Sequence, residues 1–229
     1  MKFAIIPARG GSKRVVRKNL RAFAGQPMLS WPVRAAIASG CFDQVIVSTD
    51  DPEIANLAQQ LGVTTPYLRP AELADDHTGL IAVMRHAIEQ VPCSPNDQVC
   101  CLYATAAFVE PEDLRLGLQR LDAQGFDFCV AVTPFRAPID RALRQTPDGH
   151  LTMLEPKRYQ TRSQDLETLY HDAGQFCWGR AQAWLSSDNV FQSNCAGVVV
   201  PSYRAHDIDT EDDWAHAELM FNALRKPLS

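Results

Sequence analysis

The sequence has no long apolar run, and this absence limits where the protein can work. The first apolar stretch, residues 3–6, is broken by Pro7 and Arg9, and no later segment reaches the roughly 18 apolar residues of a membrane span. The formal net charge of −5 gives no general attraction to nucleic acid or to an anionic membrane. We therefore expect a cytoplasmic protein that binds neither nucleic acid nor membrane.

Cysteine pairs with the spacing of a metal or redox site are also missing. The chain has seven cysteines, an odd number, and none of them has the C-x-x-C spacing of a zinc or redox site. We interpret these cysteines as buried, reduced thiols. Glycine and proline are not abundant, at 12 and 15 of 229 residues, which excludes collagen-like repeats and low-complexity disorder.

The length and the hydrophobic pattern predict one α/β domain. A chain of 229 residues with 46% hydrophobic residues can bury one medium-sized core, and no repeat or linker divides residues 1–229. Strand-like and helix-like segments alternate, which favours parallel strands joined by right-handed crossovers. The fold class we expect is a three-layer, Rossmann-like α/β domain with a mainly parallel sheet. The expected strands are 2–6, 44–49, 97–103, 126–132 and 197–201, and the expected helices are 28–39, 53–61, 80–90, 111–121, 181–186 and 212–224. Residues 174–178 resume the alternation before the helix at 181–186.

Residues 134–167 interrupt this alternation. Short apolar runs alternate with charge there, and Pro147, Asp148 and Gly149 form a turn signal. We expect a small insertion that carries a β-hairpin and leaves the main sheet.

Acidic residues are absent before Asp43, whereas seven of the 22 basic residues lie in the first 21 positions. Most of these cations follow the first expected strand, and ligands in open α/β sheets bind beyond the carboxyl ends of strands. The loop reads Ala8, Arg9, Gly10, Gly11, Ser12, Lys13 and continues to Lys18 and Asn19. Its glycines can expose backbone N–H groups to an anion, and its cations can bind phosphate oxygens. The loop matches neither the G-x-x-x-x-G-K-[ST] nor the G-x-G-x-x-G motif. It predicts a phosphate-binding loop, and a plain surface turn with solvated cations is the alternative.

Two carboxylates, Asp207 and Asp209, lie two positions apart near the last expected helix. In an extended segment they point to the same side, and such a pair suits Mg²⁺ that also binds substrate phosphates. The alternative is that this segment caps the helix, with Thr210 or Asp209 as the capping residue. We assign Asp212 and Asp213 to the helix start, and Asp207 and Asp209 to a magnesium site.

A dense polar stretch covers residues 162–176. Arginine binds carboxylates in bidentate fashion, so this composition suits a polyhydroxylated, carboxylated ligand. A salt-bridged surface is the alternative, and His171 alone does not indicate catalysis.

Several of these segments resemble one enzyme family. They are residues 5–13, 18–19, 47–51, 69–75 and 207–210. Together they are similar to the cytidylyltransferases that activate nonulosonic (sialic-type) acids, and the similarity extends over nearly the whole chain. Segments 103–106, 162–167 and 170–176 are most similar to the members that act on pseudaminic acid. At 103–106 this chain has Tyr-Ala-Thr-Ala, where the neuraminic acid enzymes have a Gln-Pro-Thr-Ser-Pro-type segment.

The resemblance implies a nucleotidyltransferase fold that transfers CMP from CTP to pseudaminic acid, with Mg²⁺ and with pyrophosphate as the second product. It also implies a homodimer, with the insertion serving in dimerisation and in the sugar site. The implied CTP-binding residues are Ala8, Arg9, Gly10, Gly11, Ser12, Lys18, Asn19 and Arg69. Arg9, Lys18 and Asp209 would act in catalysis, and Asp207 and Asp209 would hold the metal. The implied sugar-binding residues are Tyr103, Arg162, Gln164, Tyr170, Gln175 and Phe176, and Trp178 could add apolar contact.

Other functions stay open at this point. The acceptor could be N-acetylneuraminate or legionaminate, or the enzyme could load KDO or a hexose phosphate. A nucleotide-binding sensor of the same fold is the non-enzymatic alternative. The general base is not readable from the sequence, and Asp209 is only a candidate.

Overall fold

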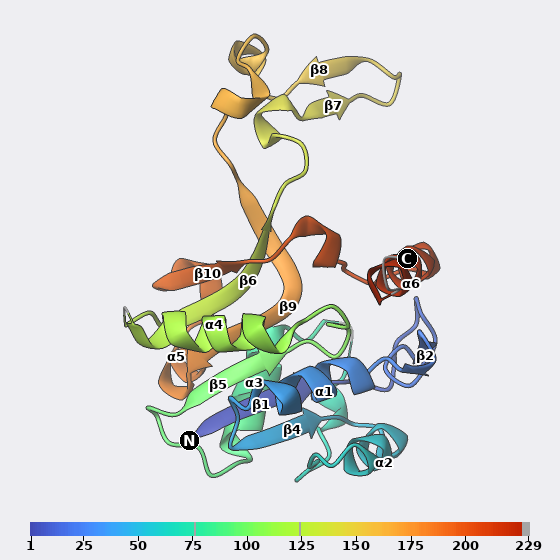
Figure 1. Ribbon diagram of the computed structural model, residues 1–229, viewed down its shortest axis with the longest axis vertical. Coiled ribbons are helices and arrows are strands. Elements are labelled where there is room, and N and C mark those ends of the chain that lie inside the picture. Colours follow the sequence, from blue (N-terminus) through green and yellow to red (C-terminus); the bar gives the residue numbers. More distant parts are fainter. Residues whose placement is uncertain (76, 124, 226–229) are drawn as a thin grey trace.

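Six strands form the central sheet, in the order β10-β6-β9-β5-β1-β4 (Figure 1). The computed structural model describes residues 1–75, 77–123 and 125–225. Strand β9 runs antiparallel to both of its neighbours, and the other pairs are parallel. The prediction of a mainly parallel sheet is therefore confirmed. The strands are β1 (Lys2–Pro7), β4 (Gln44–Ser48), β5 (Gln98–Leu102), β6 (Phe128–Pro134), β9 (Tyr170–Arg180) and β10 (Cys195–Val199).

Helices cover both faces of this sheet, as predicted. In β1, Ala4 and Ile6 pack into one core layer, whereas Phe3 and Ile5 pack into the other. This alternation explains why residues 3–6 of the strand are all apolar. On the first face lie α1 (Ser30–Ser39), α2 (Pro52–Gln60) and α4 (Pro111–Ala123), and on the second lie α3 (Leu80–Glu89) and α5 (Ala181–Ser186).

A third apolar cluster lies outside the sheet and positions the basic loop. Two short strands, β2 (Ala22–Phe23) and β3 (Gln26–Pro27), form a small antiparallel pair after this loop. Phe23 makes edge contacts with Trp214 and Phe221 of the last helix, α6 (Glu211–Arg225), at centroid distances of 5.3 and 5.2 Å. The loop after β1 is thereby packed against the start of α6, although the two are far apart in the sequence.

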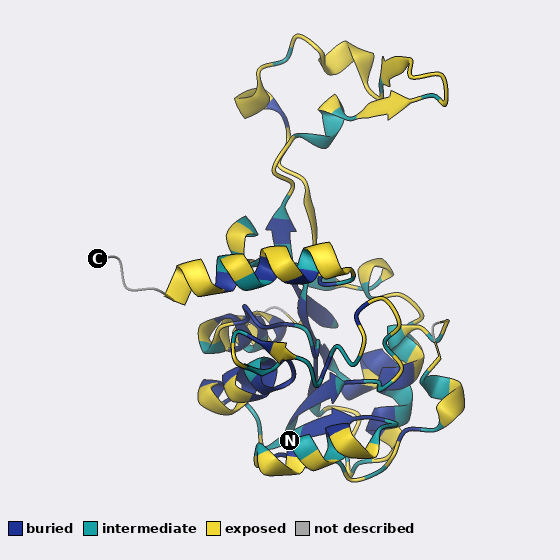
Figure 2. Cartoon of the chain, turned by 90° about the vertical axis from the view of Figure 1, so that its right-hand side faces the viewer, coloured by how far each residue is buried: buried dark blue, intermediate teal, exposed yellow. Residues whose placement is uncertain are grey.

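The insertion projects away from the sheet as an arm, which we define as residues 135–169 (Figure 1). It carries the hairpin β7 (Leu143–Gln145) and β8 (Leu151–Met153), where the turn signal predicts one. Figure 2 shows that most of the arm is exposed. Short 3₁₀ helices lie in the arm at Ile139–Arg141, Pro156–Arg158 and Ser163–Asp165, and elsewhere at Ala71–Leu73, Val190–Gln192 and Ser202–Arg204.

The cysteines are free thiols, as the absence of C-x-x-C pairs predicts. Five of the seven cysteines are buried, two are half-buried, and all seven are free thiols. Burial raises the pKa of Cys195 to about 11, which keeps its thiol protonated.

No helix in the described part of the chain is long and apolar enough to cross a membrane.

Candidate active site

The basic loop is fixed to the carboxyl end of β4. The Gly10 amide donates a hydrogen bond to Asp50 Oδ1 at 3.0 Å. Asp51 caps α2 by accepting from the Glu53 amide at 2.8 Å, and a Cβ on Gly10 would lie 2.5 Å from Asp51 Oδ2. Only glycine permits this close approach, since any side chain would displace the helix cap.

Beyond this contact the loop encloses a cavity of about 330 Å³, which we call the phosphate cavity. Lys18 Nζ donates to the Ile208 carbonyl at 2.5 Å and lies 3.3 Å from Asp209 Oδ1. Arg14 Nη2 lies 2.8 Å from Asp209 Oδ2. A cationic loop and a carboxylate from the opposite end of the chain therefore share one wall. The lining residues are Arg9, Ser12, Lys13, Arg14, Lys18, Asn19 and Asp209.

Two predicted nucleotide-binding residues, Asn19 and Arg69, are buried against the loop. Asn19 Nδ2 donates to the Arg9 carbonyl at 3.0 Å, which fixes the loop backbone. Arg69 lies 3.8 Å from Asp50 Oδ1, the same oxygen that holds Gly10, and burial lowers the pKa of its guanidinium. Asn19 lines the cavity, whereas Arg69 does not. In this conformation Arg69 supports the loop from behind.

The two predicted metal ligands do not serve as the helix cap. Thr210 and Asp213 form that cap reciprocally: the Thr210 amide donates to Asp213 Oδ2 at 2.8 Å, and the Asp213 amide donates to Thr210 Oγ1 at 3.2 Å. Asp209 faces the phosphate cavity, and Asp207 lines a second cavity. The capping alternative thus belongs to Thr210 and Asp213.

The donor set fits a cation that is shared with a substrate. Burial, and then the nearby Asp209 carboxylate, raise the pKa of Asp207, so the pair carries a repulsion that a divalent cation would relieve. Among the described residues, no group of three or more His, Cys, Asp or Glu side chains could hold a metal alone. A divalent cation held by Asp207 and Asp209 would need further ligands, such as the phosphate oxygens of a substrate.

Three of the predicted sugar-binding residues lie on strands of the sheet or directly after one, and they differ in exposure. Tyr103 follows β5, and its amide donates to the Gln175 carbonyl at 2.9 Å. Burial raises the pKa of the Tyr103 hydroxyl, with further contributions that include the Asp172 and Asp207 carboxylates. Gln175 is 2% exposed, and Phe176 is fully buried. Tyr103 packs against the hydrophobic core and is in the lining of neither cavity, and the Phe176 side chain lies in the core.

Alternation along β9 explains the position of Phe176. Phe176 and Trp178 share one face of the strand and pack beneath α4, where a Cβ on Gly117 would lie 2.8 and 2.7 Å from their rings. Neither aromatic ring can supply the apolar contact that we expected for the sugar.

The other three predicted sugar-binding residues lie on the arm or at its base. Arg162 is 71% exposed at its side chain, and its Nε donates to Asp165 Oδ2 at 2.7 Å. Gln164 is exposed beside it, and Tyr170 begins β9 at 49% exposure. Within one chain, the structure does not bring Arg162 or Gln164 to the phosphate cavity.

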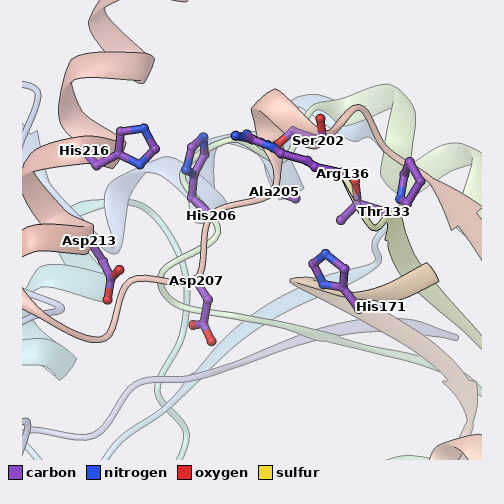
Figure 3. Close-up of a pocket in the computed structure, with 10 residues that line it drawn as sticks. Thr133, Arg136, His171, Ser202, Ala205, His206, Asp207, Asp213 and His216 are labelled. Atoms are coloured by element: carbon purple, nitrogen blue, oxygen red, sulfur yellow. Dashed lines mark hydrogen bonds between the residues drawn. The ribbon is translucent and has the colours of Figure 1, made fainter. Parts of the chain in front are cut away.

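Sequence reasoning missed the second cavity, of about 260 Å³, between the end of β6 and the start of α6 (Figure 3). Three histidines, His171, His206 and His216, contribute to it with Asp207. These histidines are far apart in the sequence, and no motif links them. The only available signal is the rule that residues following the strands of an open sheet meet at one edge. The remaining lining residues are Thr133, Pro134, Arg136, Ser202, Ala205 and Asp213.

Comparisons with known proteins agree with this geometry. A sequence model described as Cytidylyltransferase matches residues 3–177. Pseudaminic acid cytidylyltransferase of Campylobacter jejuni subsp. jejuni serotype O:2 is 39% identical over 219 residues, which are 95% of this chain and 94% of that protein. CMP-N,N'-diacetyllegionaminic acid synthase of Legionella pneumophila subsp. pneumophila is 28% identical and covers 98% of each chain.

A solved structure shows the same fold. CMP:2-keto-3-deoxy-manno-octonic acid synthetase in complex with CTP has a TM-score of 0.73, covers 97% of this chain and 99% of its own, and is 16% identical. At that identity the likeness concerns the fold alone, a nucleotidyltransferase fold. Because the family model spans most of the sequence and a 39% identical relative aligns with 95% of it, this chain belongs to the cytidylyltransferase family.

Proposed function

We propose that this protein transfers CMP from CTP to the anomeric hydroxyl of pseudaminic acid and releases pyrophosphate. The observation that carries this proposal is the phosphate cavity, where Arg14 and Lys18 face Asp209. The relative that is 39% identical and named as a pseudaminic acid cytidylyltransferase supports the choice of acceptor.

In the proposed reaction, the sugar hydroxyl attacks the α-phosphorus of CTP. A new oxygen–phosphorus bond forms, the bond to the β-phosphate oxygen breaks, and the hydroxyl proton is released. Negative charge develops on the phosphoryl oxygens and on the departing pyrophosphate. The cations of Arg9 and Lys18, fixed before the substrate arrives, stabilise that charge without reorganising.

Asp207 and Asp209 would hold Mg²⁺. When bound there, the ion supplies positive charge that offsets the charge of the phosphate oxygens. Lys18 holds Asp209 in place through its ion pair and anchors the neighbouring Ile208 carbonyl. For the hydroxyl proton, Asp209 remains our candidate acceptor because it lies on the wall of the cavity.

We also propose a homodimer formed through the arm. Leu143, Leu151 and Tyr159 of the arm are 61%, 53% and 73% exposed, which is costly for large apolar side chains in water. A partner chain would cover them and could bring its own Arg162 to the sugar site. Light scattering of the purified protein tests this proposal, and the mass of a monomer would contradict it.

We place the reaction in the cytoplasm. Seven free cysteines support this location, because thiols stay reduced in the cytosol and tend to be oxidised in secreted proteins.

The function is tested by incubating the protein with CTP, Mg²⁺ and an equimolar mixture of pseudaminic and N-acetylneuraminic acids. We expect pyrophosphate, and a CMP product whose mass is that of the pseudaminic acid conjugate. Equal or greater kcat/KM with N-acetylneuraminic acid would contradict the acceptor but not the cytidylyltransferase activity. No pyrophosphate with either sugar, with legionaminic acid or with KDO would favour a nucleotide-binding sensor.

A further inference from the structure

The second cavity lies beside the phosphate cavity, and Asp207 lines it. Strand β6 contributes Thr133, the start of the arm contributes Arg136, and β9 contributes His171 (Figure 3). Since Asp209 lines the phosphate cavity, the 207–209 segment separates the two cavities. A molecule in the second cavity would therefore lie next to the phosphates of CTP.

Thr133 contributes a buried hydroxyl, unpartnered within the described part of the chain, to the wall of this cavity. Its side chain is 1% exposed, and its Oγ1 has no hydrogen-bond partner among the described residues. A buried hydroxyl without a partner is costly, and it seldom persists unless a ligand or an ordered water completes it. Thr133 lines the cavity, and a rotation of its side chain would turn this buried hydroxyl toward a bound molecule.

The cavity is lined by one arginine in one part and by carboxylates in another. Arg136 carries a permanent positive charge, and its guanidinium points toward the His206 ring in Figure 3. The His206 Nε2 atom lies 2.9 Å from the Tyr203 carbonyl oxygen, and the centroids of the His206 and Phe108 rings are 4.5 Å apart. These two contacts hold the His206 ring in place. The carboxylates of Asp207 and Asp213 line another part of the cavity, away from Arg136 (Figure 3). The cavity thus combines a cation, a buried hydroxyl and the carboxylate of Asp207, one of the two proposed metal ligands.

We propose that this cavity binds the carboxylate of the acid sugar, with the guanidinium of Arg136 paired to it and the Thr133 hydroxyl donating a hydrogen bond to it. This inference rests on the proposed function. In a nonulosonic acid the carboxylate is attached to the anomeric carbon, so its binding site must adjoin the reacting hydroxyl. The position of Asp207 between the two cavities satisfies that requirement. Arg136 thereby takes the role that the sequence pattern assigned to Arg162, whose guanidinium is paired with Asp165.

The test measures binding and turnover separately. Calorimetric titration with pseudaminic acid, and with its methyl ester, is carried out on the wild type, Arg136→Gln, Arg136→Lys and Arg34→Gln. Arg34 is an exposed arginine on α1, outside both cavities, and serves as the matched control. We expect Arg136→Gln to weaken binding of the acid by about 10- to 100-fold, and Arg136→Lys to recover part of the loss. The affinity for CTP should not change. The ester should bind weakly, and equally, to the wild type and to Arg136→Gln.

Thr133→Val provides a second, independent readout. It removes an unpaired buried hydroxyl at almost constant volume, so we expect the melting temperature to stay the same or to rise while the affinity for the acid falls. A merely structural Thr133 would give the reverse pattern.

Unchanged affinity of Arg136→Gln for the acid, equal binding of acid and ester to the wild type, or no binding of the acid at all would overturn the inference. If the expected binding pattern occurs but the wild type forms no pyrophosphate, the carboxylate site stands and the proposed function fails. If pyrophosphate forms and Arg136→Gln has the wild-type KM for the sugar, the function stands and the carboxylate site fails.

Discussion

Lys18 Nζ lies 3.3 Å from Asp209 Oδ1, although 191 positions separate the two residues. The same amine donates to the Ile208 carbonyl at 2.5 Å. One side chain therefore joins the loop after β1 to the segment before α6, and this contact defines one wall of the phosphate cavity.

Replacing Lys18 by Gln should lower kcat/KM for CTP by roughly 100-fold, because a fixed cation at a developing negative charge typically contributes that much. The measurement is steady-state pyrophosphate release. Lys2→Gln, at the opposite end of β1, is the control and should behave like the wild type. Equal kcat/KM for Lys18→Gln and Lys2→Gln would remove Lys18 from the site.

Asp209→Asn should abolish the dependence on magnesium. The wild type, with CTP present, should melt at a higher temperature when Mg²⁺ is added, since a ligand that binds the folded state stabilises it. The variant should lose this increase, and its turnover should stay low at saturating Mg²⁺. Asp212→Asn, on the first turn of α6, is the matched control. A wild-type response of Asp209→Asn to Mg²⁺ would show that Asp209 is not a ligand.

Asp207→Asn should stabilise the metal-free protein while it lowers activity. The folded-state pKa of Asp207 is raised, chiefly by burial, so the ionised carboxylate destabilises the fold above that pKa. This penalty disappears as the pH falls below the unfolded-state value. Thermal melts at neutral and acidic pH, without metal, should show the variant more stable at neutral pH and the difference closing in acid. A variant that is less stable at neutral pH would contradict this account of Asp207.

Gly10→Ala should destabilise the protein, whereas Gly11→Ala should not. A Cβ on Gly10 would lie 2.5 Å from the Asp51 carboxylate, and one on Gly11 has no described atom within 4 Å outside its own neighbourhood. We expect a loss of about 1–3 kcal/mol in the free energy of unfolding for Gly10→Ala, typical of overpacking. Urea unfolding measures both variants, and equal stabilities would show that the loop can move away from α2.

Arg204→Met should cost about 3 kcal/mol in the free energy of unfolding, because it leaves a buried carboxylate unpaired. Arg204 Nη2 donates to Asp113 Oδ1 at 3.0 Å, and the Arg204 carbonyl accepts from Gln175 Nε2 at 2.7 Å. The double variant Asp113→Leu with Arg204→Met should recover part of the loss. If the double variant is less stable than the single one, this pair contributes more than charge compensation.

The elements of the fold could be predicted because local chemistry determines them. In the strand at residues 2–6, positions 3–6 are all apolar because both faces of the strand are covered. Gly40 ends α1 in the left-handed conformation, at φ 65°, which the glycine at that point predicts. The grouping of Arg9, Ser12 and Lys18 with Asp209 follows from the rule that strand ends meet at one edge of a sheet.

Other features depend on contacts that no local pattern carries. An apolar strand reads the same in either direction, so the antiparallel course of β9 between β5 and β6 was not predictable. Phe176 lies next to polar residues in the sequence, but strand alternation turns its ring toward Gly117 in the core. Arg136 and His206 are 70 positions apart in the sequence and become neighbours only when the chain folds.

The sheet order also sets the sequence of events as the chain leaves the ribosome. Strand β1 finds a neighbour as soon as β4 is made, and β5 adds to its other side. Strand β6 must wait, because it pairs with β9 and β10, and the whole arm is synthesised before Tyr170 begins β9. During that interval β5 and β6 present unpaired edges. A nascent chain stalled within the arm would therefore be prone to aggregate, and β9 is the strand that joins the two halves of the sheet.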